Sequence, residues 1–510
     1  MNPGRSLISA AAALITAAAL LSGVSHAADW RPQPVPDSAA SGSALSGIAI
    51  DGVRTLFYAD DGVLVAVTSR KKGWRAAEPI TPVSGSVQRI ASVVAEDGTV
   101  TIAWTEGNLI DTTRLRVVQR IEGTWSSPIE LSLNYAVDSM SLLQHRRIAY
   151  VAASWHVSAD TQDTSLGVWR VHDGASEARP NPADVERPNA VTLFSSGNFV
   201  GLAWCSDPAG KAKVAFLTPL LSTWGPTTQV NAGVNSISGR TVTAAGGTDA
   251  AEDGTTAVVT WMQNRRSEWY ARKIRGNQLA PTTDTLLIGE QGTRLEDLDA
   301  AWASQEKVAF LTAVDESFNR SSILGSVVAS GAADPAAVIY DTDGSVTTSL
   351  QATGTGAVIS WKRANGGEIM ARTWYPKGDS WMLQRPAGLG FSYYGPAVIA
   401  DVTPSVAWKD RDGDLAQLSL DLQGPRLKRA RAVASGRIKV AWNAPPQMVV
   451  TDYVVKRRPR GGSWKTVDRV QSKRTSFRGI PGTTYDVRVR ARAPQTASAW
   501  SAKKTVTARR

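Results

Sequence analysis

Residues 98–132, GTVTIAWTEGNLIDTTRLRVVQRIEGTWSSPIELS, contain the pattern that decides the fold. An apolar segment ends in Trp104, and its side chains alternate, so that Val100, Ile102 and Trp104 share one face of a strand. A polar turn leads into a second alternating segment, which is followed by Gly-x-Trp, a proline and a short last strand. This pattern predicts an antiparallel meander of short strands.

The same pattern recurs along residues 46–424 in eight copies about 50 residues apart, which is the spacing of four-stranded propeller blades. In six copies the strand ends in tryptophan, at Trp104, Trp155, Trp204, Trp261, Trp361 and Trp408. Weaker equivalents lie near Phe57 and Phe310. We therefore predict an all-β protein in which residues 28–424 form a β-propeller of eight blades, or alternatively seven. We expect the strand-ending tryptophans to pack between adjacent blades.

The last copy, residues 395–425, supplies only three strands. The segment DWRPQPVP, residues 29–36, resembles the element TWSSPIEL that ends the copy quoted above. We expect this N-terminal segment to provide the missing fourth strand, because closing the ring removes the exposed edges of an open sheet.

The first residues have the features of a secretory signal peptide, assigned to residues 1–27. Arg5 precedes an apolar stretch from Leu7 to Leu21, and Ser-His-Ala at 25–27 fits a cleavage site. No later apolar run is long enough to span a membrane. We expect a secreted, extracellular monomer that can associate with the cell wall.

A single cysteine, Cys205, excludes an intramolecular disulfide, and its apolar surroundings predict a buried, inert thiol. His145, His156 and His172 show no metal-ligand spacing. No cofactor or metal ion is expected.

The last 84 residues have a pattern of their own. Ile438, Val440 and Trp442 alternate in one apolar strand, and Tyr485 precedes the alternating run VRVRARA. With SAWS at 498–501, these residues resemble a fibronectin type III domain, assigned to residues 427–510. The resemblance implies a β-sandwich, with Tyr485 at the tyrosine corner and no catalysis.

The repeats resemble those of secreted bacterial β-propeller proteins and, more loosely, sialidase-like and lectin-like propellers. No copy of the Asp box of sialidases, Ser-x-Asp-x-Gly-x-Thr-Trp, occurs.

The charge is unevenly distributed. Residues 426–510 contain 22 Lys or Arg against 3 Asp or Glu, a net charge of +19, whereas the rest of the chain has a net charge of −8. If Val487, Val489 and Ala491 face the core, the arginines between them form a row on the outer face. The residues predicted to bind a polyanion are Lys456, Arg457, Arg458, Arg460, Arg488, Arg490 and Arg492. Alternatively, this is a solvated basic surface, or one that rests against the acidic body.

No catalytic residue is assigned. Glu106, Asp207, Asp410, Asp412 and Asp414 follow strand-ending tryptophans, but hairpin turns account for such aspartates. The tryptophans predicted to stack on sugar rings are Trp74, Trp125, Trp224 and Trp381.

The sequence thus predicts a non-catalytic protein that binds carbohydrate or cell-wall polymer, with the basic domain attaching it to a polyanion or surface. The partner expected is a polysaccharide or an anionic cell-wall polymer. Nucleic acid is less favoured, because no exposed aromatic platform is evident. The alternatives are a glycosidase that degrades polysaccharide and a protein-interaction scaffold.

Overall fold

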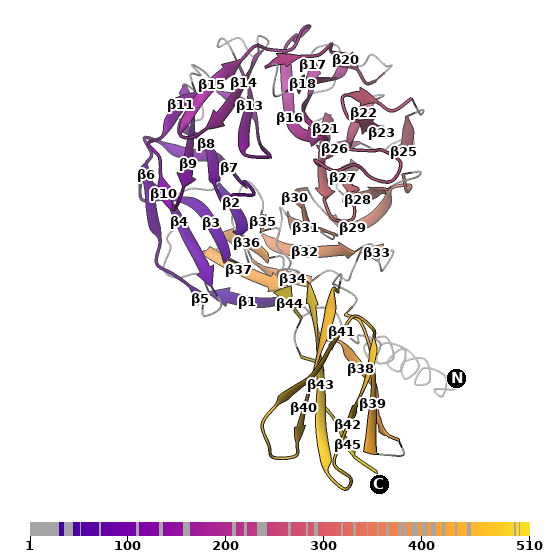
Figure 1. Cartoon of the computed structure of the whole chain (residues 1–510). Helices are drawn as coiled ribbons and strands as arrows, with labels where there is room; N and C mark the ends of the chain where they lie inside the picture. Colours follow the sequence, from indigo (N-terminus) through magenta and orange to yellow (C-terminus); the bar gives the residue numbers. More distant parts are fainter. Residues whose placement is uncertain are drawn as a thin grey trace, which may run out of the picture. The chain divides into compact units, whose positions relative to one another are not determined.

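The structure is a computed structural model of the whole chain (Figure 1). It describes residues 30–34, 44–50, 53–70, 73–108, 112–131, 136–156, 164–206, 211–218, 222–231, 242–263, 267–281, 284–289, 294–317, 320–329, 333–343, 345–353, 356–363, 367–375, 380–381, 385–389, 396–399, 405–409, 415–420, 424–433, 436–445, 450–493, 496–498 and 500–509. The predicted signal peptide, residues 1–27, lies outside these ranges. Within them, no helix is long and apolar enough to cross a membrane.

The chain divides into two compact units, which are described separately. The larger unit comprises Pro32–Ser419 with Pro494–Thr496. The smaller unit comprises the described residues within Leu420–Ala493 and Ala497–Arg510, and the division also assigns Trp30 and Arg31, the first residues of a strand that pairs in the larger unit, to it. The described part of both units is built from β-strands without an α-helix, so the all-β prediction is confirmed.

The described strands of the larger unit form eight antiparallel sheets of four or five strands. The first four sheets are β2 (Leu45–Ile50), β3 (Val53–Asp60), β4 (Val63–Arg70), β5 (Gly73–Trp74) and β6 (Glu78–Pro82); β7 (Ser86–Val94), β8 (Val100–Asn108), β9 (Thr112–Ile121), β10 (Thr124–Trp125) and β11 (Ile129–Leu131); β12 (Val137–His145), β13 (Ile148–His156), β14 (Thr164–His172) and β15 (Ala175–Arg179); and β16 (Pro188–Ser196), β17 (Phe199–Ser206), β18 (Lys211–Thr218), β19 (Thr223–Trp224) and β20 (Thr228–Gln229).

The remaining four sheets are β21 (Val242–Gly246), β22 (Ala257–Gln263), β23 (Glu268–Arg275), β24 (Gln278–Leu279) and β25 (Thr285–Gly289); β26 (Leu295–Ala303), β27 (Val308–Ser317), β28 (Arg320–Val328) and β29 (Ala337–Asp343); β30 (Val346–Thr353), β31 (Gly356–Arg363), β32 (Glu368–Tyr375), β33 (Ser380–Trp381) and β34 (Arg385–Leu389); and β1 (Trp30–Pro34) with β35 (Ala397–Ile399), β36 (Ser405–Lys409) and β37 (Leu415–Leu420).

These sheets are arranged around a ring (Figure 1). The first strand along the chain is innermost in seven of the sheets, and β35 is innermost in the sheet that contains β1. The innermost strands contact one another in a closed cycle, in the order β2, β7, β12, β16, β21, β26, β30, β35 and back to β2. This arrangement is a β-propeller, and the predicted fold class is confirmed.

The N-terminal strand closes the ring as predicted. The sheet order β1-β37-β36-β35 places Trp30–Pro34 at the outer edge of the last sheet, next to Leu415–Leu420. One end of the repeat region therefore completes the sheet that the other end begins, which leaves no unclosed gap in the ring of sheets.

The repeated tryptophans pack between neighbouring sheets, and this prediction is confirmed. Trp104, Trp204, Trp261 and Trp361 have no exposed surface. Trp104 shares its cluster with Phe57 of the preceding sheet, and Trp361 shares its cluster with Phe310. Cys205 is also buried, as expected.

The smaller unit is a β-sandwich (Figure 1). One sheet contains β38 (Arg426–Ala432), β39 (Arg437–Asn443) and β42 (Arg474–Arg478), and the other contains β41 (Lys465–Val470), β40 (Asp452–Pro459), β43 (Thr484–Ala493), β44 (Thr496–Ala497) and β45 (Lys504–Thr507). Ile438, Val440 and Trp442 are buried, as predicted. The Tyr485 hydroxyl accepts a hydrogen bond from the Ile480 backbone N–H at 3.0 Å, which forms the predicted tyrosine corner.

Candidate polyanion-binding face

Two of the tryptophans predicted to bind sugar, Trp125 and Trp224, link adjacent sheets of the propeller. The Trp125 indole N–H donates to the Glu78 carboxylate at 3.2 Å, and the Trp224 indole N–H donates to the Pro180 carbonyl at 2.6 Å. Trp74 is half-buried. For Trp381 only the backbone is described, in β33. Among the three described side chains, each ring is thus partly covered, and sugar stacking remains a prediction.

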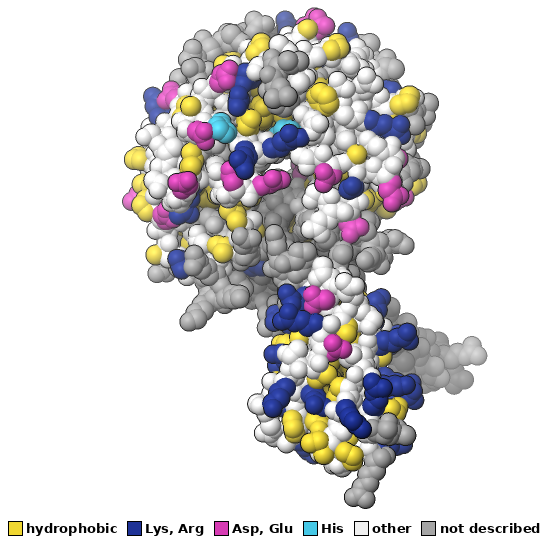
Figure 2. Space-filling model, in the orientation of Figure 1, with side chains coloured by type: hydrophobic (Ala, Val, Ile, Leu, Met, Phe, Trp, Pro, Cys, Tyr) yellow, Lys and Arg dark blue, Asp and Glu magenta, His cyan; other side chains and the backbone are white. Residues whose placement is uncertain are grey.

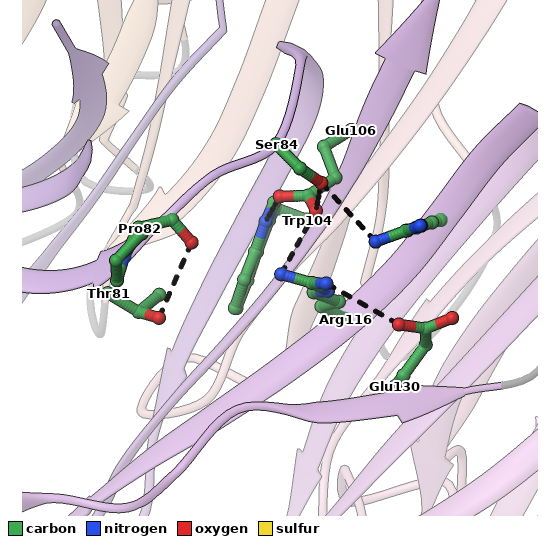
Figure 3. A network of polar contacts seen from close by, with 8 residues as sticks. Thr81, Pro82, Ser84, Trp104, Glu106, Arg116 and Glu130 are labelled. Carbon is green, nitrogen blue, oxygen red and sulfur yellow. Dashed lines mark hydrogen bonds and ion pairs between the residues drawn. The ribbon is translucent and has the colours of Figure 1, made fainter. Parts of the chain in front are cut away.

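The strand-ending carboxylate that the structure describes, Glu106, is buried in a network of polar contacts (Figure 3). It accepts hydrogen bonds from the Trp104 indole N–H at 3.0 Å and the Ser84 hydroxyl at 2.7 Å. It also forms an ion pair with Arg116 at 3.0 Å, and Arg116 in turn lies 3.4 Å from Glu130. Because both oxygens of Glu106 are engaged, this group fixes the end of its blade. The candidates Asp207, Asp410, Asp412 and Asp414 lie outside the described residues.

A second carboxyl group lies at the start of the third sheet. Asp138 sits at a β-bulge of β12, and its carboxylate lies 2.8 Å from the His156 Nε2 atom. Burial raises the pKa of the Asp138 carboxyl, against the opposing attraction of His156 and Arg89. In the described part of the chain, no group of three or more His, Cys, Asp or Glu side chains is arranged to hold a metal ion.

The middle of the ring contains a cavity of about 330 Å³ lined by the innermost strands. Small side chains such as Ser139, Thr192 and Ala244 make up much of its wall, together with Asp299 and Trp302. The Asp299 carboxylate accepts hydrogen bonds from two backbone N–H groups, of Ala300 at 2.9 Å and of Leu350 at 3.0 Å. The cavity therefore offers a narrow polar space around one carboxylate that backbone donors already hold.

Alternation along β43 places its arginines on the outer face of the sandwich, as predicted. Val487, Val489 and Ala491 have no exposed surface, so Arg488 and Arg490 point away from the core. In the neighbouring strand β40, Lys456 lies directly opposite Arg488. Figure 2 shows Lys and Arg side chains over the visible side of this unit, with few Asp or Glu side chains among them.

Two tryptophans that the sequence analysis did not single out organise this face. The Arg488 guanidinium lies between the Trp464 ring, 4.1 Å away, and the Trp500 ring, 4.3 Å away. Lys456 and Arg490 also lie over Trp500, and Arg458 lies over Trp464. We call this set the ladder face: Lys456, Arg458, Arg488, Arg490, Trp464 and Trp500.

The stacking has an electrostatic consequence for Arg488. Burial lowers the pKa of its guanidinium, and repulsion from Arg458 and Arg490 adds to this effect. Cation–π attraction to the two tryptophan rings partly compensates the Arg488 guanidinium for its lost hydration. Trp464 and Trp500 are far apart in sequence, and only the strand pairing brings them to one face, where cations lie over both rings.

The other predicted cations are distributed differently. Arg457 does not join the ladder face, because its neighbours Tyr453 and Val455 face the core and it shares their side of the strand. Its guanidinium lies over the Phe477 and Tyr485 rings and donates to the Arg478 carbonyl. Two more predicted residues lie near the ends of the strands: Arg460 is exposed beyond β40, and Arg492 lies 4.0 Å from Asp452.

All three acidic residues of the sandwich have partners. Asp486 accepts hydrogen bonds from Thr505 at 2.9 Å and Arg458 at 3.1 Å. Asp468 accepts one from Thr475 at 2.6 Å, and Asp452 faces Arg492. The hydrogen bond from Thr505, followed by those from its cationic neighbours, lowers the pKa of Asp486 despite burial. The large excess of cations in this unit is therefore available to anions from outside it.

Residues 424–507 match the family model of the fibronectin type III domain, so this part of the chain is confirmed as such a domain. No curated protein matches the sequence. Among solved structures, the chain is similar to the Dos1 propeller, at 9% identity and a TM-score of 0.46 over 76% of this chain and 95% of that one. It is also similar to the polysaccharide lyase Uly1, at 10% identity and a TM-score of 0.40 over 64% and 88% of the two chains. A third similar structure is an α-L-arabinanase of Penicillium chrysogenum, at 11% identity and a TM-score of 0.33 over 62% and 98%.

Proposed function

We propose that this protein is an extracellular, non-catalytic binding protein for acidic carbohydrate or cell-wall polymer, and that its fibronectin type III domain holds the polymer at the ladder face. The observation that carries the proposal is the stack of cations on two tryptophan rings, centred on Arg488 at 4.1 and 4.3 Å from the rings. Arg460 and Arg492 extend the positive charge on either side of this set.

The chemistry of the ladder face suits an acidic sugar better than a simple anion. Guanidinium groups bind carboxylate, sulfate and phosphate oxygens through paired N–H donors. Tryptophan ring faces pack on the apolar faces of sugar rings. On the ladder face, cations lie over both tryptophan rings, and both rings remain partly exposed beside them. An acidic sugar can therefore pair its charged group with a cation while its ring lies against the exposed part of a tryptophan.

The experiment is a retention and affinity measurement with the full chain on polygalacturonate, with a neutral galactan as the reference polymer. We expect binding to polygalacturonate that is tighter than to galactan and weakens only in part between low and high salt. The variant K456S/R490S removes two ladder cations, and K465S/R509S removes two exposed cations outside that face. The proposal requires the first variant to bind several-fold more weakly than the second. Equal binding by both variants, or no preference for the acidic polymer, would contradict it.

A second candidate function is favoured by Asp138. A carboxyl group with a raised pKa, partly exposed beside His156, has the protonation behaviour of a general acid in glycoside hydrolysis. The test is the release of reducing sugar from polysaccharide by the full chain and by D138N. If the wild type releases sugar, and D138N releases none but is still retained on the polymer, the function is hydrolysis and not binding alone. If the full chain releases no more reducing sugar than a heat-denatured sample does, the proposal of a non-catalytic binding protein stands.

A further inference from the structure

The other sheet of the sandwich has an outer face that is also densely basic. Strand pairing sets Arg431, Lys439 and Ser476 in one cross-strand row, and Arg429, Ala441 and Arg474 in the next row. The third row pairs Arg437 with Arg478. Because Ile438, Val440 and Phe477 point into the core, these six cations all point outward.

These cations differ from those of the ladder face in their surroundings. Arg429, Arg431, Lys439 and Arg474 are exposed, and within the described residues none of them belongs to an ion pair. Like charges directly opposite each other on neighbouring strands, such as Arg431 and Lys439, destabilise a sheet. An anion bound from outside would relieve this repulsion.

The same four cations surround a hollow of about 720 Å³. Its wall also contains the hydroxyl group of Ser476, which can donate to an anionic oxygen, whereas the Ser472 hydroxyl donates to the Arg474 carbonyl at 2.7 Å. Among the described residues that line the hollow, none is aromatic. Neighbouring rows of the sheet lie about 7 Å apart along the strands. The hollow therefore presents guanidinium and hydroxyl donors in two rows, without a ring on which a sugar or a base could stack.

We infer that this surface, the basic cradle formed by Arg429, Arg431, Lys439 and Arg474, is a second binding site, on which the charged groups of an acidic polysaccharide lie along the sheet. The inference rests on the proposed function, since it assigns the same class of polymer to another face of the same domain. Carboxylate, sulfate and phosphate groups share the oxygens that arginine pairs with, and charge alone holds them here. The two sheets of a sandwich face outward on opposite sides, so one domain can hold two stretches of polymer.

The experiment is a calorimetric titration of the full chain with short polygalacturonate, dextran sulfate and polyphosphate of defined length, each at two salt concentrations. The test variant is R431S/R474S, and the control K465S/R509S removes the same charge from exposed positions outside the cradle. We expect the wild type to bind two oligomers per chain. We expect R431S/R474S to keep one site at the wild-type affinity and to bind more weakly at the other, more salt-sensitive site, and we expect the control to keep both affinities. The affinity at the affected site should fall about five- to tenfold. Because the four replaced side chains are exposed, we expect neither variant to unfold at a lower temperature than the wild type.

The outcomes separate the two proposals. In one outcome, K456S/R490S binds more weakly than the wild type, and R431S/R474S binds as well as the control. This outcome overturns the proposed site at the cradle and retains the one at the ladder face. No binding of any oligomer overturns both. Tighter binding of single-stranded DNA than of all three oligomers at the cradle overturns the assignment of its occupant. Tighter binding of polyphosphate than of both polysaccharides also overturns that assignment, whereas tighter binding of polygalacturonate or dextran sulfate supports it.

Discussion

The propeller contains a buried histidine, His145, and the burial of this residue makes the stability of the propeller depend on pH. His145 ends β12 and is only 2% exposed. Its Nδ1 atom lies 3.1 Å from the Ser195 hydroxyl, and its Nε2 atom is buried without a hydrogen-bond partner among the described residues. Burial, followed by repulsion from Arg146, lowers the pKa of His145 to about 4.

The direction of this pH dependence follows from the protonation of His145 in the folded and the unfolded chain. In the unfolded chain the imidazole titrates near its ordinary pKa of about 6.5. Between pH 6.5 and 4 the unfolded chain therefore binds a proton that the folded propeller does not, so the free energy of unfolding falls as the pH falls through this window. With a folded pKa of about 4, this one group removes about 3 kcal/mol of stability between pH 7.5 and pH 4.

The assay is the unfolding of the full chain by urea at pH 7.5, 6, 5 and 4, with the propeller transition followed separately from that of the sandwich. The variant H145Q keeps a polar group beside Ser195 but takes up no proton. We expect the pH dependence of the wild type to exceed that of H145Q by about 3 kcal/mol over this range. The control H172Q replaces a histidine whose side chain is 39% exposed, and it tests whether the change in slope is specific to His145. Identical slopes for wild type and H145Q would refute the reasoning.

Three further changes test other contacts. E106A removes the acceptor of the Trp104 indole N–H and the closer of the two carboxylates beside Arg116, so it should lower propeller stability by roughly 3 kcal/mol in urea unfolding, and more than E106Q does. Because the pKa of Asp486 is lowered, the sandwich should lose stability as the pH falls below about 4, and T505V should reduce this loss in the same measurement. G201A adds a Cβ atom 2.2 Å from the Phe194 ring and should lower the melting temperature of the propeller, unless Phe194 finds another rotamer.

The propeller could be predicted because its pattern is local and repeated. A strand of alternating apolar residues that ends in Trp104 imposes the same burial in each copy, and the equivalent Trp361 repeats it. The closing strand at Trp30–Pro34 could also be anticipated, because the last copy lacked a strand and the N-terminal segment matched it. Both inferences need only periodicity and the cost of an unpaired sheet edge.

The basic domain was predicted less completely, because its faces depend on strand register. Alternation alone places Arg457 with Val455 on the core side, and applying it strictly would have removed Arg457 from the polyanion set. The meeting of Trp464 and Trp500 around Arg488 depends on the β-bulge between Val455 and Lys456 and on the pairing of β40 with β43. Single-strand patterns do not contain that information.

The two basic faces of the sandwich differ in how far their cationic side chains are already ordered and desolvated by contacts within the fold. On the ladder face, Arg488 is held between two tryptophan rings and is partly desolvated. A ligand that binds it therefore loses less side-chain entropy and pays less desolvation than one that binds a free arginine. On the cradle, Arg431 and Arg474 are exposed and hydrated, so a polymer gains charge attraction there but must order these side chains itself. Binding at the ladder face should therefore persist at salt concentrations that release the cradle. A polymer held in this way would remain attached through one face while the other exchanges.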